Sequence, residues 1–109
     1  MRADSHLNIA AELLKTYALA DEPKLLLAAV AEAREALREM NSRSQLARKL
    51  DRLLIQYKES PMAFSRRGKL VICDSDYAME TLDGQRVSGF IEAAREEIEH
   101  DERKLLASR

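Results

Sequence analysis

The sequence has few of the residues that interrupt helices or cross-link a chain. Its 109 residues include one cysteine, two prolines and three glycines. The single cysteine, Cys73, excludes an internal disulfide and a zinc site built from several cysteines. Because proline and glycine are scarce while alanine, leucine, glutamate and arginine are abundant, the composition favours helices. We therefore expect a mainly α-helical protein.

Aromatic residues and long apolar runs are also scarce. The chain has no tryptophan, three tyrosines and two phenylalanines, which leaves few rings on which nucleic-acid bases could stack. No stretch approaches the ~18 consecutive apolar residues of a membrane span, and residues 1–6 lack the apolar run of a signal peptide. These absences predict a cytoplasmic protein that does not enter membranes, folded as a single small domain over 1–109.

Apolar residues recur at helical spacing in the first half of the chain. Spacings of three and four residues predict helices over 6–20, 22–40 and 43–58. Ser42 and Gln45 match a capping box at the start of the third of these helices. We expect the three helices to pack as an N-terminal bundle.

The second half of the chain has a different pattern of apolar residues. The runs 69–73 and 77–82 alternate weakly and predict a small β-hairpin, with 61–67 as a connector. Ser88 is the expected N-cap of a long C-terminal helix. The expected fold is thus mainly α (α+β), with a three-helix N-terminal bundle, a hairpin at about 69–82 and a long C-terminal helix.

Charge is sorted along the chain although its net value is only −1. Residues 1–40 carry a net charge of −2, residues 41–70 carry +6, and residues 71–109 carry −5. A basic middle and an acidic end can hold each other, hold a second subunit, or bind two outside partners. Because both charged helices also have an apolar face for a shared core, we favour pairing within the chain or between subunits.

The basic charge gathers on one face of the third helix. Arg48, Lys49 and Arg52 lie opposite the leucines of that helix, and Arg66 and Arg67 extend the basic segment. Such a face can contact phosphates. The segment lacks the glycine turn of a helix-turn-helix motif, so nucleic-acid binding is the alternative hypothesis for this protein.

The first two helices are more apolar than a small core requires. In the second, residues 25–31 include no polar side chain at all. Large apolar surfaces are rarely left exposed on monomers, so this excess predicts contact with another protein or with a second copy, as a homodimer. The candidate partner-binding residues are Leu13, Tyr17, Leu25 and Leu27.

One short motif suggests catalysis. Asp74-Ser75-Asp76 follows an apolar run and resembles the opening motif of haloacid-dehalogenase-type phosphatases, which bind a divalent metal. The resemblance covers about seven residues, and Tyr77-Ala78 stand where that family has Gly-Thr. Only 33 residues follow Asp76, too few for the later motifs of the family.

We therefore predict no enzyme, with no catalytic residues, cofactor or metal. His6 and His100 lie near opposite ends of the chain, without ligand spacing between them. The leading hypothesis is a non-enzymatic protein–protein interaction module: a small intracellular regulator, inhibitor or adaptor that acts through apolar helix faces and segregated charge.

Overall fold

Four helices and three short strands form the described part of the chain. The computed structural model describes residues 2–20, 22, 24–59, 64–66, 69–73 and 79–107. The elements are, in chain order, α1 (Arg2–Ala20), α2 (Lys24–Glu39), α3 (Gln45–Glu59), β1 (Phe64–Arg66), β2 (Lys69–Cys73), β3 (Met79–Leu82) and α4 (Gly84–Ala107). The mainly α-helical class expected from the composition is confirmed.

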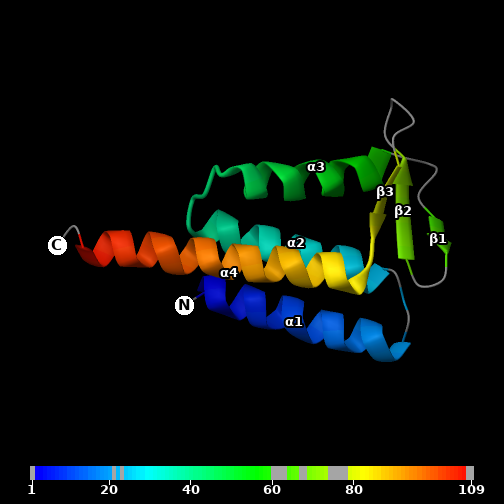
Figure 1. Ribbon diagram of the computed structural model, residues 1–109, viewed down its shortest axis with the longest axis horizontal. Coiled ribbons are helices and arrows are strands. Elements are labelled where there is room, and N and C mark those ends of the chain that lie inside the picture. Colours follow the sequence, from blue (N-terminus) through cyan, green and yellow to red (C-terminus); the bar gives the residue numbers. More distant parts are fainter. Residues whose placement is uncertain are drawn as a thin grey trace.

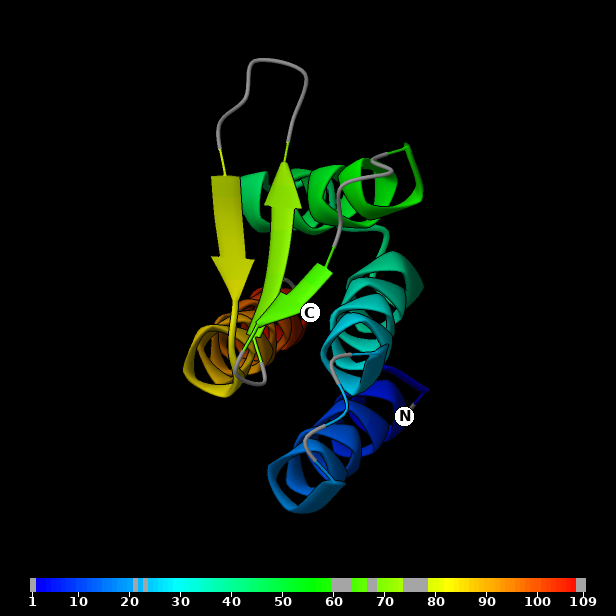
Figure 2. The ribbon, with the colours of Figure 1, turned by 90° about the vertical axis from the view of Figure 1, so that its right-hand side faces the viewer.

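The arrangement of the helices differs from the three-helix bundle that we expected. Helices α1 and α3 lie on opposite sides of α2, and α4 packs against all three (Figures 1 and 2). The physical reason is the apolar stripe of α4, where Val87, Ala94 and Ile98 are almost fully buried. This stripe packs beside α2, in the position that α1 or α3 would fill in a bundle of α1, α2 and α3 alone.

The strands form one antiparallel sheet in the order β1-β2-β3. Phe64 pairs with Val71 between β1 and β2, and Leu70 pairs with Leu82 between β2 and β3. Strand β1 is a correction, because we assigned 61–67 to a connector. In Figure 2, α3 passes behind the end of the sheet at which β2 finishes, and β3 leads directly into α4.

Helix α2 is the centre of the core. The expectation that residues 25–31 are buried on most sides agrees with the burial of Leu26, Leu27, Ala29 and Val30. Helix α1 covers one side of α2 through Leu7 and Ala10, which are fully buried. Much of the apolar excess seen in the sequence is therefore used within a single copy of the chain.

Two helix starts differ from those expected. Ser44, not Ser42, caps α3, because its hydroxyl accepts the N–H of Ala47 at 3.2 Å. Asp83 caps α4 by accepting the N–H of Arg86 at 2.8 Å, so α4 begins four residues before the expected cap, Ser88. In both cases the capping side chain satisfies an amide that has no partner within the first helical turn.

Candidate functional site

The four residues expected to contact a partner lie mostly against the core. Leu27 is 8% exposed, and Leu25 is half-buried. Leu13 and Tyr17 are partly buried and pack on the core, and the Tyr17 ring would lie 3.4 Å from a Cβ atom added at Gly84. The structure therefore brings Tyr17 to the start of α4 and leaves little of Leu27 for an outside partner.

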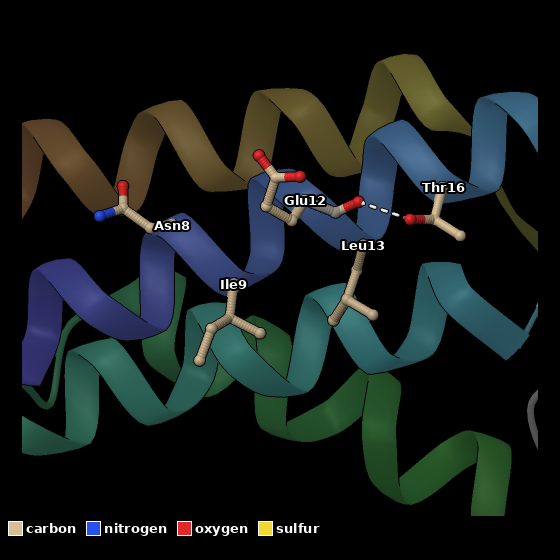
Figure 3. Close-up of a pocket in the computed structure, with 5 residues that line it drawn as sticks. All are labelled: Asn8, Ile9, Glu12, Leu13 and Thr16. Atoms are coloured by element: carbon tan, nitrogen blue, oxygen red, sulfur yellow. Dashed lines mark hydrogen bonds between the residues drawn. The ribbon is translucent and has the colours of Figure 1, made fainter.

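A shallow apolar depression lies on the outer face of α1. Its volume is about 280 Å³, and its lining residues are Asn8, Ile9, Glu12, Leu13 and Thr16 (Figure 3). Ile9 is 46% exposed, and Leu19, farther along the same helix, is 91% exposed. This surface can accept an apolar side chain, and Leu13 is the residue that it shares with the predicted set.

The exposed face of α3 is basic. Arg48, Lys49 and Arg52 are all exposed, whereas Ala47, Leu50 and Leu53 fix the opposite face of the helix in the core. Within the part of the chain that the structure describes, none of the three cations forms an ion pair with a carboxylate. Their charge is therefore available to an outside anion.

Lys49 also joins α3 to α4 through an aromatic ring. Its Nζ lies 5.6 Å from the centre of the Phe90 ring, and Cζ of Arg86 lies 5.7 Å from the same centre. Arg86 Nη1 additionally donates to the carbonyl oxygen of Thr81 at 3.2 Å. Sequence reasoning missed Arg86, because it is far from the basic segment in the sequence and only the fold brings it to Lys49.

Of the other two residues of the nucleic-acid hypothesis, the structure describes the backbone position of Arg66. Arg66 lies in β1, paired with Lys69 of β2. Their end of the sheet lies beside the start of α4, whereas α3 crosses the opposite end (Figures 1 and 2). Arg67 is outside the described residues.

The acidic helix does not neutralise the basic one in the described residues. Glu92, Glu96 and Glu99 of α4 are exposed. Glu97 instead points to the turn before α3, where one carboxylate oxygen accepts the hydroxyl of Ser42 and the other accepts that of Ser44 at 2.9 Å. Within the described residues, Glu97 of α4 thus binds the two serines and forms no ion pair with Arg48, Lys49 or Arg52.

The turn between α2 and α3 is tightly bonded. Asn41 has a φ of 53°, a left-handed conformation that asparagine tolerates better than most residues. The N–H of Ser42 donates to the Leu37 carbonyl at 3.0 Å, and that of Asn41 donates to the Arg38 carbonyl at 2.9 Å. This is a Schellman motif, and it occupies the last carbonyl groups of α2 with backbone donors.

A second depression, of about 470 Å³, opens at this turn. Three arginines and two neutral polar residues line it: Arg34, Arg38, Asn41, Ser42 and Arg43. Arg34 is anchored by Asp51, whose carboxylate accepts its Nε at 2.5 Å. That hydrogen bond raises the pKa of Arg34 above its ordinary value, and desolvation by burial opposes the effect.

Side chains that could ligate a metal ion do not gather in the described part of the chain. No cluster of three or more histidine, cysteine, aspartate or glutamate side chains there could hold a metal ion. Asp74 and Asp76 fall outside the described residues, and His6 is bonded through Nδ1 to Glu32 at 2.7 Å. None of the described helices has the length and apolar content to cross a lipid bilayer.

Comparison of the chain with protein-family models, with curated proteins and with solved structures gave no match.

Proposed function

We propose that this protein is a non-enzymatic protein–protein interaction module, a small regulator, inhibitor or adaptor, that recognises an acidic surface of its partner. The observation that carries the proposal is the exposed face of α3, where Arg48, Lys49 and Arg52 have no carboxylate partner in the described residues. The buried face of α3 fixes these cations on a rigid element. Complementary charge on a rigid element favours fast and selective association.

The composition of the α3 face supports a protein partner. Ile55 is 52% exposed and follows Arg52 by three residues, so it lies on the same face as Arg48 and Arg52. Arginine beside an exposed apolar side chain is typical of protein interfaces. Phe90, the aromatic ring that Lys49 contacts, is only 8% exposed and offers little surface on which a base could stack.

The rest of the charge distribution also favours a protein partner over nucleic acid. The exposed glutamates of α4 and the net charge of −1 repel a long polyanion such as nucleic acid. A partner protein can place a compact acidic patch against α3 without approaching α4. The apolar depression around Ile9 and Leu13 is a second contact surface in this proposal, for the same partner or for a second copy of the chain.

The test is a pull-down from the native lysate, with the wild-type protein and matched variants as bait. A protein captured by the wild type should be lost with the double variant Arg48→Glu/Arg52→Glu. It should be retained with Lys15→Glu, since Lys15 is an exposed cation on α1, outside the α3 face. If both variants capture the same proteins as the wild type, the α3 face is not the interface.

Nucleic-acid binding is the second candidate, and the pairing of two helices at Phe90 favours it. Because Lys49 and Arg86 both contact this ring, their charged groups lie within about 11 Å of each other, and the basic surface extends onto α4. Arg48→Ala and Arg52→Ala should each weaken binding to any sequence. Each should also reduce the salt slope by about one, as measured by fluorescence anisotropy. An absence of salt-dependent binding to DNA or RNA removes this candidate.

A further inference from the structure

The depression at the α2–α3 turn has the chemistry of an anion site. We propose that it binds the phosphoryl group of a small molecule, a function separate from the interaction proposed for the face of α3. Its five lining residues include three arginines, asparagine and serine, and none of the five is acidic. Its volume of about 470 Å³ lies within the range of ordinary small-molecule sites, about 300–1,000 Å³.

Backbone N–H groups compete with the arginines for carbonyl acceptors at the end of α2. Carbonyl groups at a helix C-terminus are the usual acceptors for nearby cationic side chains. Here the carbonyls of Leu37 and Arg38 accept the N–H groups of Met40, Asn41 and Ser42. These two carbonyls are therefore poor acceptors for the neighbouring guanidinium groups, which favours an external acceptor.

Arg34 supplies a fixed positive charge at the base of the site. Its side chain is only 15% exposed and is oriented by the bond from Nε to Asp51. Its Nη1 is buried and has no hydrogen-bond partner. A guanidinium held at one edge keeps its other N–H groups in a fixed plane, the geometry that suits phosphate oxygens.

Arg38 and Arg43 supply the outer charges. Arg38 pairs with Glu35 at 3.5 Å, but both side chains are substantially exposed, and such pairs contribute little. Arg43 is exposed and makes no ion pair in the described residues. The side chains of Arg38 and Arg43 can therefore turn toward a bound anion at little cost. Asn41, which also lines the depression, adds an amide donor.

The experiment measures phosphate binding directly. Amide chemical shifts of the labelled protein are followed by NMR during titration with inorganic phosphate and, separately, with phenyl phosphate. Sodium chloride of equal ionic strength is the reference. We expect saturable shifts confined to the amides of residues 38–44. Tighter binding of phenyl phosphate identifies a phosphate ester as the ligand, and equal or tighter binding of inorganic phosphate identifies the free ion.

Matched variants then locate the site. Arg43→Gln and Arg38→Gln should each weaken phosphate binding about tenfold, the loss expected for one charge-assisted hydrogen bond. Arg48→Gln, which removes an exposed arginine outside the depression, should change it less than twofold. Arg34→Lys keeps the charge beside Asp51 but loses the planar fork, and it should weaken binding while thermal unfolding shows the protein still folded.

Two results overturn the proposal. One is a titration in which phosphate and chloride of equal ionic strength give the same shifts. The other is an equal loss of binding in Arg43→Gln and Arg48→Gln, which would indicate diffuse attraction by the basic segment. Neither outcome depends on the α3 interface, because the Arg48→Glu/Arg52→Glu variant can lose its protein partner and still bind phosphate.

Discussion

Helices α1 and α3 lie on opposite sides of α2 (Figure 2), and they present different chemistry to solvent. The outer face of α1 exposes Ile9 and Leu19 beside a shallow apolar depression. The outer face of α3 exposes Arg48, Lys49 and Arg52. An apolar face gains free energy by excluding water, whereas a basic face attracts partners over several ångströms of solvent.

The two helices are also attached differently. Helix α1 packs on both α2 and α4, whereas α3 packs mainly on α2 and has a smaller contact with α4. The ion pair of Arg34 with Asp51 reinforces the α2–α3 contact, and Glu97 ties the turn before α3 to α4. A polar pair also links α1 to α2, between His6 and Glu32, so α3 differs from α1 chiefly in its smaller packing contacts. The following substitutions test that difference in order of decreasing effect.

Core truncation should give the largest effect on both sides. Leu7→Ala in α1 and Leu50→Ala in α3 each remove a fully buried side chain, and each should destabilise the protein by about 2–5 kcal/mol in urea unfolding. Amide hydrogen exchange should distinguish the effect of Leu7→Ala on α1 from that of Leu50→Ala on α3. Leu50→Ala should accelerate exchange in α3 more than Leu7→Ala does in α1, because the contacts of α3 with the rest of the fold are smaller. Equal acceleration in both helices would contradict the difference in attachment.

The ion pair between α2 and α3 should give the next largest effect. Arg34→Ala removes the partner of a half-buried Asp51, and we expect a loss of about 2 kcal/mol, typical of a hydrogen bond between charged groups. Arg38→Ala is the matched control. Its pair with Glu35 is exposed, and its removal should change stability by less than about 0.5 kcal/mol. Similar values for the two variants would mean that the buried pair does not hold α3.

The turn before α3 offers a comparison of two serines. Both hydroxyls donate to Glu97, and each accepts a backbone N–H. Ser42 accepts that of Ser44 at 3.4 Å, before the helix, whereas Ser44 accepts that of Ala47 at 3.2 Å, in the first turn of α3. Ser44→Ala should therefore cost about 1 kcal/mol more than Ser42→Ala in thermal or urea unfolding. An equal loss of stability in the two variants would show that the hydrogen bonds to Glu97, and not the helix cap, stabilise this turn.

These serines show where sequence reasoning succeeds and where it stops. The helical periodicity that places Leu46, Leu50 and Leu53 on one face is local, so the basic face of α3 could be predicted from the sequence. The cap was assigned two residues early. The reason is that the left-handed Asn41 extends the α2 ending to Ser42, and spacing alone does not reveal that conformation.

Contacts between distant residues set the remaining limit. The pairing of Arg34 with Asp51 and the convergence of Lys49 and Arg86 on Phe90 depend on how helices cross, which no local pattern encodes. The same holds for Leu27, which we assigned to a partner contact because of its apolar character and which is only 8% exposed in the core. Asp83-Gly84 reads as a turn and proved to be a helix start, since the same residue types serve both.

Exposed apolar residues on α1 should give the smallest effect on stability. Leu19 is 91% exposed and Ile9 is 46% exposed, so Leu19→Ser and Ile9→Ser should change the free energy of unfolding by less than about 0.5 and about 1 kcal/mol, respectively. Their effect on association separates the two faces. If α1 mediates self-association, both variants should weaken it in sedimentation equilibrium, and added salt should not. If association instead uses the basic face of α3, salt should weaken it while Ile9→Ser leaves it unchanged, because screening acts on charges and not on apolar contact.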